Sequence, residues 1–168
     1  DWLTANGLPA ERALPYAEPC VALSRDDCDA LTAGGYRMAR CEAVAQNVAA
    51  LRAAIQQGPI YAVFTMMSDF APYQGGVYEW QRGWPDGMHS VALVGYQDTP
   101  GAYGGGWFIV RNSSGPEWGE DGYVRIGYSQ VSNQVGLGIG AYRCWGVVAA
   151  PPVDVWYFPW VRRFADGV

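Results

Sequence analysis

The chain contains no lysine, a single histidine and no long apolar segment. Its 11 basic residues are all arginines scattered along the sequence, and the formal net charge is −5 at pH 7. This charge argues against a nucleic-acid partner, because phosphate neutralisation requires clustered basic side chains. No apolar run reaches the roughly 18 residues of a membrane-spanning helix. The first residues, Asp1 to Thr4, lack the basic start and apolar centre of a signal peptide, so we expect that such a segment was removed or never existed.

The overall composition is that of a folded domain. Hydrophobic residues make up 50% and charged residues 16% of the 168 residues, which excludes a disordered chain or a fibre. A chain of this length is one ordinary domain or a large piece of a longer protein, and it can bury a core. The net negative charge predicts an acidic surface.

Four cysteines are present, Cys20, Cys28, Cys41 and Cys144, and the first three lie close together in a segment rich in Asp, Gly and Ala. An even count suits an oxidising compartment, so we expect a secreted protein or another extracytoplasmic, lysosome-like location. One disulfide among the three clustered cysteines is the favoured interpretation. Zinc binding is the alternative, but it needs about four nitrogen or sulfur ligands at tight spacing, and the only histidine is distant.

The first third of the sequence predicts helices separated by an irregular segment. Residues 1–7 are predicted to end a helix, with Gly7 as its left-handed stop, and residues 8–41 are predicted to be irregular. A second helix is predicted over Glu42–Gln57, and Gly58-Pro59 ends it. Its apolar face, at spacings of four, three and four residues, comprises Val44, Val48, Leu51 and Ile55.

From Pro59 onward, short β-type runs alternate with glycine-rich turns. The predicted strands are 60–66, 76–80, 89–96, 106–112, 122–127 and 138–148. Several strands in succession after one helix predict an antiparallel sheet or half-barrel, so the fold class is α+β. Residues 98–106 contain four glycines and one proline and are predicted to form a surface loop. The aromatic tail 151–168 is expected to pack on its own domain or on a neighbouring one.

His89 and Asn112 are the candidate catalytic residues. His89 begins one β-branched run and Asn112 ends the next, so the two side chains can meet in a sheet. Thiol acyl transfer needs a thiolate, an imidazole that keeps it ionised and later protonates the leaving amine, and a group that fixes the ring. A neutral amide oxygen suits the third role because it orients the ring without neutralising the imidazolium. A histidine alone in an apolar run is more often structural, so the surrounding motifs decide the interpretation.

Five ordered blocks resemble the papain family of cysteine peptidases over nearly the whole chain to about residue 148. The blocks are Gly58-Pro59-Ile60 with Val63, the segment Phe70–Tyr78, His89 with Ala92, Val94, Gly95 and Tyr96, Arg111-Asn112-Ser113 with Gly115, and Trp118–Tyr123. The family's closing strand is similar to Gly138-Ile139 and Tyr142. The resemblance implies an α+β papain-like fold. Residues 1–43 would end its helical half-domain, residues 44–148 would form its β-rich half-domain, and residues 149–168 would be an aromatic tail.

The resemblance also implies a role for each matching residue. His89 would be the general base and acid, and Asn112 would orient it. Trp118 would form the aromatic wall on the leaving-group side of the cleft, although it is also a candidate core residue. The pocket for the second substrate side chain before the scissile bond would be flanked by Val63, Met88 and Ser90. Turns are the expected role of Gly115, Gly119 and Gly122. No metal or organic cofactor is implied.

Two departures from the family pattern matter. Ser114 stands where the family has a tryptophan that shields the Asn–His hydrogen bond, which predicts a wetter and weaker bond. Residues 1–168 also contain no Q-x-x-x-x-x-C-G-S-C-W type segment, which in the family holds the oxyanion glutamine and places the nucleophilic cysteine at a helix N-terminus, where its pKa is low. The pair Cys144-Trp145 is superficially similar to the end of that segment. It lies in a β-type run after Asn112 without a following helix, so we reject it as the nucleophile.

The sequence therefore predicts the fragment of a cysteine-type peptidase that carries the His/Asn half of the site. Its expected partners are an N-terminal fragment of the same precursor, which carries the nucleophilic cysteine, and a peptide or protein substrate. This chain alone is expected to be inactive. Two other classes stay open: a non-catalytic papain-like binding module that lost its nucleophile, and a transglutaminase-like enzyme. The second usually orients its histidine with aspartate, so Asn112 speaks against it.

Overall fold

The computed structural model describes residues 36–149. They belong to two compact units: unit 1 comprises Asp1–Cys41 and Trp145–Val168, and unit 2 comprises Glu42–Cys144. Unit 2 holds His89 and Asn112. The helix end predicted at 1–7, the cysteines Cys20 and Cys28, and the tail 151–168 lie outside the described residues.

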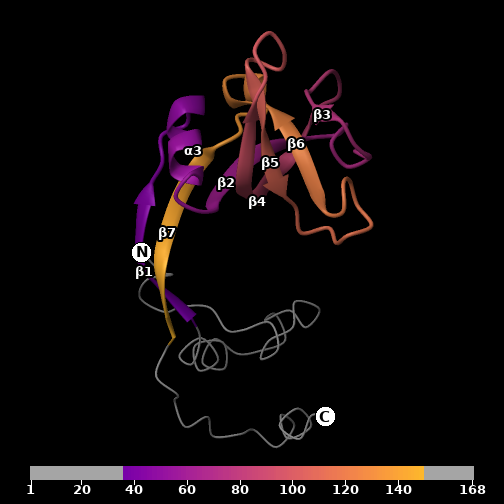
Figure 1. Cartoon of the computed structure of the whole chain (residues 1–168). Helices are drawn as coiled ribbons and strands as arrows, with labels where there is room; N and C mark the ends of the chain where they lie inside the picture. The colour runs from indigo at the N-terminus through magenta and orange to yellow at the C-terminus, as the bar shows by residue number, and fades with distance from the viewer. Residues whose placement is uncertain (1–35, 150–168) are drawn as a thin grey trace, which may run out of the picture. The chain divides into compact units, whose positions relative to one another are not determined.

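Unit 2 is built on a β-sheet (Figure 1). Its strands are β2 (Ile60–Met67), β3 (Val77–Tyr78), β4 (Pro85–Asp98), β5 (Gly106–Arg111), β6 (Tyr123–Gly127) and the part of β7 (Ile139–Ala149) up to Cys144. A short 3-10 helix, η2 (Tyr128–Val131), follows β6. The spatial order is β7-β2-β4-β5-β6-β3, and neighbours pair antiparallel except for β3 and β6, which run parallel. The predicted α+β class is confirmed, and the edge strand β3 is a parallel exception to the predicted antiparallel sheet.

Alternation along the strands decides which side chains enter the core. In β2, Ile60, Ala62 and Phe64 are buried while Tyr61 between them is exposed, because successive strand residues point to opposite faces. The largest fully buried side chains are Phe64, Phe70, Phe108, Leu51, Ile60, Met67, Leu93, Ile126, Leu137, Val110, Val124 and Val135. All of them belong to unit 2, so this unit has its own core. That core holds in place strand β4, which carries His89, and strand β5, which is followed by Asn112.

The helix of unit 2 is shorter than the sequence predicts. Helix α3 spans Val48–Ile55 rather than Glu42–Gln57. Its N-cap is Asn47, whose Oδ1 accepts a hydrogen bond from the backbone N–H of Ala50 at 2.8 Å. This bond satisfies an amide that has no partner inside the helix. The helix therefore begins at the cap, and the residues before it are free to take another conformation.

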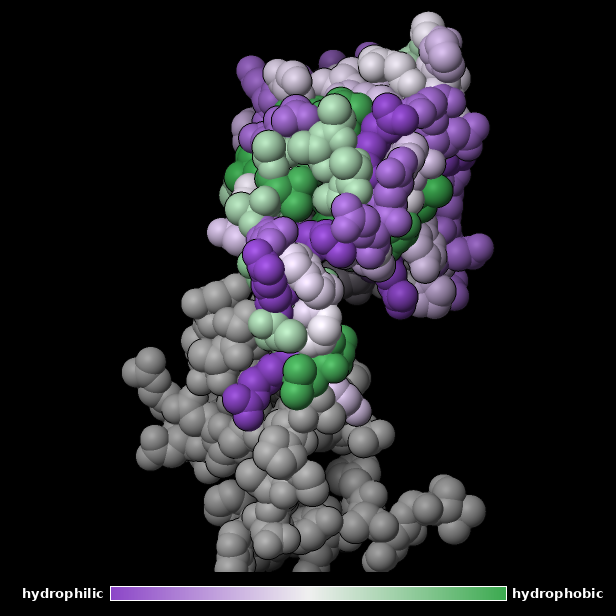
Figure 2. All heavy atoms as spheres, turned by 60° about the vertical axis from the view of Figure 1, so that its left-hand side comes forward, coloured by the Kyte–Doolittle hydropathy of each residue, from purple (hydrophilic) through white to green (hydrophobic). Residues whose placement is uncertain are grey.

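The predicted apolar face of α3 does contact the core. Leu51 and Ile55 are buried, and Val44 and Val48 pack half-buried against the same cluster. Outward-facing positions such as Ala49 are exposed. Figure 2 shows hydrophobic side chains gathered on the face of the protein that comes forward from the α3 side of Figure 1. The helix is thus held by one row of side chains, as its spacing predicts.

Strand β1 (Tyr36–Ala43) occupies residues for which the sequence predicts an irregular segment and the first turn of the helix. The prediction is wrong here because the side chains of β1 are exposed or half-buried throughout, so the sequence shows no alternation of apolar and polar residues. Within unit 1, the described residues of β1 neighbour those of β7. The guanidinium of Arg40 lies 5.4 Å from the ring centre of Trp145, a favourable cation–π distance.

Cys41 and Cys144 are both disulfide-bonded. The predicted disulfide cysteines include Cys41 but not Cys144, because sequence proximity favoured the three clustered cysteines over one in a distant strand. A disulfide sulfur cannot ionise or attack a carbonyl carbon, so the structure supports the rejection of Cys144 as a nucleophile. Among residues 36–149, the structure shows no helix of the length and apolar character that a membrane crossing requires.

Candidate active site

His89 and Asn112 meet at the ends of two neighbouring strands. His89 lies in β4, opposite Phe64 of β2, and Asn112 is the first residue after β5. The pairing of β4 with β5 begins at Ala92 and Arg111, which brings Asn112 alongside the first part of β4. His89 Nε2 and Asn112 Oδ1 are 2.8 Å apart. The strand register therefore creates the contact between the two side chains.

The other contacts of Asn112 determine which end of its amide faces the histidine. Oδ1 also accepts a hydrogen bond from the backbone N–H of Ser113 at 2.8 Å, and Nδ2 donates to Ser114 Oγ at 3.1 Å. A backbone N–H is always a donor, so the amide atom that faces it must be the oxygen. His89 consequently donates from Nε2, and a neutral ring then keeps its lone pair on Nδ1. In this tautomer Nδ1 is the atom that can take up a proton.

Two buried phenylalanines pack against the imidazole ring. Phe64 meets it edge-on at a centroid distance of 5.7 Å and an interplanar angle of 79°, and the ring of Phe70 lies 6.4 Å away. Both phenylalanines are fully buried, whereas His89 is half-buried. Dense packing on one side limits the tilt of the imidazole ring. Neither phenylalanine is predicted to be part of the site, although Phe70 lies in a matching sequence block and Phe64 is paired with His89 across β2 and β4.

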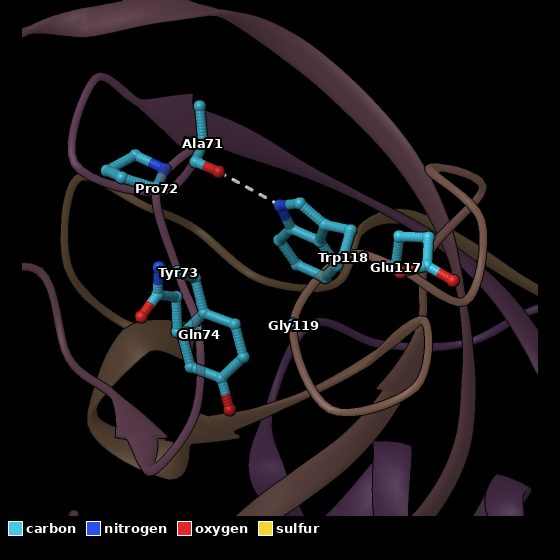
Figure 3. A pocket seen from close by; sticks show the side chains of 7 residues that line it. All are labelled: Ala71, Pro72, Tyr73, Gln74, Glu117, Trp118 and Gly119. Atoms are coloured by element: carbon cyan, nitrogen blue, oxygen red, sulfur yellow. Dashed lines mark hydrogen bonds between the residues drawn. The ribbon is translucent and has the colours of Figure 1, made fainter.

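Trp118 is wedged between two aromatic rings. Its centroid lies 5.3 Å from that of Phe70 and 5.5 Å from that of Tyr73, and Nε1 donates to the carbonyl oxygen of Ala71 at 2.9 Å. Figure 3 shows this hydrogen bond at the edge of an open pocket, which is lined by Ala71, Pro72, Tyr73, Gln74, Glu117, Trp118 and Gly119. The indole therefore packs on the core and also lines a surface pocket. The sequence suggests both a core residue and an aromatic wall at this position, and the indole has a part in each.

A polar cluster, which we call the brace, joins Tyr73, Glu120 and Arg125. Glu120 Oε2 accepts a hydrogen bond from Arg125 Nε at 2.9 Å, and Oε1 accepts from Arg125 Nη2. The single hydrogen of the Tyr73 hydroxyl is shared between Glu120 Oε2 at 3.0 Å and the carbonyl oxygen of Gly76 at 2.6 Å. The two-pronged bond to Arg125 lowers the pKa of the Glu120 carboxyl and raises the pKa of Arg125. Burial raises the pKa of the Tyr73 hydroxyl, which therefore stays protonated and donates. Tyr73 and Glu120 lie in two of the matching sequence blocks, but the brace itself is not predicted, because Tyr73 is 47 residues from Glu120 in the sequence.

Gly119 connects Trp118 to the brace. Its φ of +60° lies in the left-handed region, and a Cβ there would lie 2.6 Å from the carbonyl oxygen of Tyr123 and 3.1 Å from the ring of Tyr73. Only glycine avoids both contacts. The expectation that Gly119 serves a turn therefore has a physical basis, and the turn places the indole against the tyrosine of the brace.

Val63, Met88 and Ser90 form a separate surface. Val63 and Ser90 are opposite each other in the β2–β4 pairing, and the side chain of Met88 is 59% exposed. Because neighbours in a strand alternate, Met88 and Ser90 point to the opposite face of β4 from His89. Tyr61, which is not among the predicted pocket residues, contributes to this surface with its hydroxyl 3.0 Å from Ser90 Oγ. The three predicted pocket residues thus share the face of β2 and β4 that is opposite the side chain of His89.

The described residues offer proton transfer rather than nucleophilic attack by a thiol. Between residues 36 and 149, no three or more His, Cys, Asp or Glu side chains are grouped so that they could hold a metal ion. Cys41 and Cys144 are disulfide-bonded, so neither supplies a thiolate. What remains is an imidazole whose neutral form carries its hydrogen on Nε2, an amide that orients the ring, and two buried phenylalanines packed against it.

Comparisons with known proteins show to which family the chain is related. A family model described as papain family cysteine protease matches residues 1–143. Cathepsin B-like CP3 of Giardia intestinalis is 33% identical over 144 residues, which are 81% of this chain and 46% of that protein. Cathepsin B-like CP2 of the same organism is 32% identical over 133 residues, 74% of this chain and 43% of that protein. The chain therefore spans less than half the length of these curated relatives.

Solved structures show the same fold. The bromelain protease from Ananas comosus in complex with the E64 inhibitor matches with a TM-score of 0.55 and 27% identity, over 65% of this chain and 51% of that chain. ProCathepsin B S9 from Trypanosoma congolense matches with a TM-score of 0.56 and 25% identity, over 66% of this chain and 37% of that chain. The papain-like α+β fold that the sequence motifs imply is confirmed.

Proposed function

Because this chain belongs to the papain family of cysteine proteases, we propose that it carries the histidine–asparagine half of a peptidase active site. The observation that carries the proposal is the 2.8 Å contact between His89 Nε2 and Asn112 Oδ1, with the amide orientation set by the N–H of Ser113. This arrangement leaves Nδ1 of a neutral ring to exchange a proton with a thiol. Such a ring can act as a base in one step and as an acid in the next.

The proposed reaction hydrolyses a peptide bond through an acyl-thioester. A cysteine thiol gives its proton to His89 Nδ1, and the thiolate attacks the carbonyl carbon of the substrate. The C–N bond then breaks as the imidazolium protonates the leaving amine. Water then attacks the carbonyl carbon of the thioester while the imidazole takes one of its protons. The C–S bond breaks, the imidazolium returns its proton to the sulfur, and the acid product is released. Asn112 accepts from Nε2 throughout, so the ring stays oriented while its charge changes.

The nucleophile in this proposal comes from an N-terminal fragment of the same precursor. Support comes from the disulfides of Cys41 and Cys144 and from the absence of a Cys-Gly-Ser-Cys-Trp type segment in residues 1–168. The substrate is a peptide or protein. Trp118 would bound the leaving-group side, and the surface of Val63, Met88 and Ser90 would contact the second side chain before the scissile bond. The disulfides also favour a secreted or lysosome-like location.

The experiment is to compare the 168-residue chain alone with the protein purified from its natural source. Intact-mass analysis of the native protein is expected to reveal a second polypeptide, and a thiolate-specific peptidyl epoxide is expected to label that polypeptide. The complex should hydrolyse a general peptide substrate, while the chain alone and a complex with His89→Ala should not. Hydrolysis by the chain alone that persists after replacement of all four cysteines would refute a thiol mechanism. A native protein with no partner polypeptide and no activity would favour the non-catalytic binding module.

A further inference from the structure

The Asn112 side chain is held at both ends of its amide. Oδ1 contacts the ring of His89 and the N–H of Ser113, both at 2.8 Å, and Nδ2 contacts Ser114 Oγ at 3.1 Å. Asn112 is half-buried, whereas Ser113 and Ser114 are exposed. Among residues 36–149, the side chain of Ser114 is the group that accepts the hydrogen bond from Nδ2, on the solvent side of the amide.

An asparagine amide needs such a restraint because the torsion that rotates it, χ2, has a broad energy minimum. The N–H of Ser113 determines which end is the oxygen, but one contact at that end still lets the amide plane tilt. A second contact at Nδ2 fixes the plane from the other side. Tilting would lengthen the bond from Oδ1 to the imidazole, and a weaker acceptor at Nε2 would let the neutral ring move its proton to Nδ1. A ring protonated on Nδ1 cannot accept a proton there.

We propose that Ser114 is a positioning residue that, through Asn112, keeps the neutral His89 ring protonated on Nε2. The inference rests on the proposed function for its catalytic meaning, but its structural content concerns only these three side chains. Ser114 stands where the family has a tryptophan, and the missing aromatic ring predicts a bond between Asn112 and His89 that is less shielded from water. The structure assigns Ser114 a polar contact instead, so the hydroxyl supports the same amide by a hydrogen bond.

The test uses NMR of the full 168-residue chain labelled with ¹⁵N. The chain has one histidine, so its ring nitrogens give one unambiguous pair of signals, and their chemical shifts report the ratio of Nε2–H to Nδ1–H tautomers. The protein should be made in a host without N-glycosylation, because Asn112-Ser113-Ser114 matches the acceptor pattern for that modification. Spectra are recorded at increasing pH, and the ratio is taken where the ring signals no longer change with pH.

Ser114→Ala is expected to lower the ratio of Nε2–H to Nδ1–H about 2- to 10-fold. This is the change in an equilibrium constant that the loss of one partly exposed hydrogen bond produces. Ser114→Thr should restore the ratio because it keeps the hydroxyl. Ser113→Ala is the matched control, since only the backbone of Ser113 contacts Asn112, and it should leave the ratio unchanged. Backbone amide spectra verify that each variant is folded. An unchanged ratio in Ser114→Ala, or an equal fall in both alanine variants, would overturn the assignment.

Kinetics of the complex with the nucleophile-bearing fragment separate this inference from the proposed function. There, Ser114→Ala should lower kcat by a similar factor and leave KM unchanged, because the substrate does not need Ser114 for binding. If the wild-type complex has no activity while the tautomer ratio responds as expected, the proposed function fails and the positioning role stands. If the complex is active and the tautomer ratio does not change in Ser114→Ala, the proposed function stands and the positioning role of Ser114 is wrong.

Discussion

The His89–Asn112 pair and the Tyr73–Glu120–Arg125 brace are both attached to the segment that links β5 to β6, but they are held in different ways. The pair is joined by neutral hydrogen bonds between side chains at strand ends, and its outer contact, Ser114, faces solvent. The brace contains a two-pronged ion pair and a tyrosine hydroxyl. Charge-assisted bonds are roughly twice as strong as neutral ones. The brace therefore stabilises the segment, and the pair remains available for proton transfer.

This difference predicts that changes in the two regions have separate effects. Side chains of the pair contribute little apolar burial, so their loss should impair the chemistry and leave the fold largely intact. Changes in the brace or in the core beneath the pair should lower stability, and they should affect the site only through its position. Trp118 lies between the two regions, because it packs on Phe70 beneath the histidine and on Tyr73 of the brace.

The largest expected effect is on catalysis by the complex with the nucleophile-bearing fragment. His89→Ala should reduce kcat/KM by at least about 10²- to 10⁴-fold, the usual contribution of proton transfer by a positioned group. Asn112→Ala should reduce it by a smaller factor, because Asn112 acts only by orienting the ring. The melting temperature should change little in both variants. Equal and negligible kinetic effects would show that the assigned roles are wrong.

Phe64→Ala tests the expectation that a change in the core beneath the His89–Asn112 pair lowers the stability of the fold. Phe64 is fully buried and contacts both Phe70 and the ring of His89. Removing a buried phenylalanine ring should lower the free energy of unfolding by about 3–5 kcal/mol, measured by urea denaturation of the chain. The exposed Tyr61→Ala, three residues earlier in the same strand, is the control and should cost much less. Similar losses in the two variants would contradict the core assignment.

Strand positions and motif residues could be predicted from the sequence because their signals are local. The runs 60–66, 106–112 and 122–127 correspond closely to β2, β5 and β6. Strand β1 escaped prediction because it lacks a buried face, and the helix was extended too far because Val44 continues the apolar spacing while Asn47 sets the start. The brace could not be predicted, since Tyr73 and Glu120 are joined only by the fold. The same is true of the disulfide bonding of Cys144.

Glu120→Gln should weaken the brace and change its response to acid. Arg125 lowers the pKa of the Glu120 carboxyl from its ordinary value of 4.5. The stabilisation that the ionised Glu120 carboxylate contributes to the folded protein is therefore complete above about pH 4.5. It is lost as the pH falls through the lowered pKa. At neutral pH the variant should be less stable by roughly 1 kcal/mol, since the pair is partly exposed. Melting temperatures across this range should converge with those of the wild type at low pH. A constant difference at every pH would show that the carboxylate charge is not responsible.

Ser114→Trp should have the smallest effect, and it restores the residue that the family has at this position. We expect kcat/KM of the complex to rise or stay unchanged, and to exceed that of Ser114→Ala. The indole would exclude water from the bond between Asn112 and His89, and the lower local dielectric would strengthen that bond, which offsets the lost contact at Nδ2. Ser114 is exposed, so the ring has room on the solvent side.

The measurement is kcat/KM together with the melting temperature. If activity and melting temperature both fall, a neighbour such as Trp118 already fills the space, and overpacking costs about 1–3 kcal/mol. In that case the site cannot hold both an aromatic ring over the Asn112–His89 bond and the hydrogen bond that Asn112 Nδ2 donates to Ser114, and this chain uses the hydrogen bond.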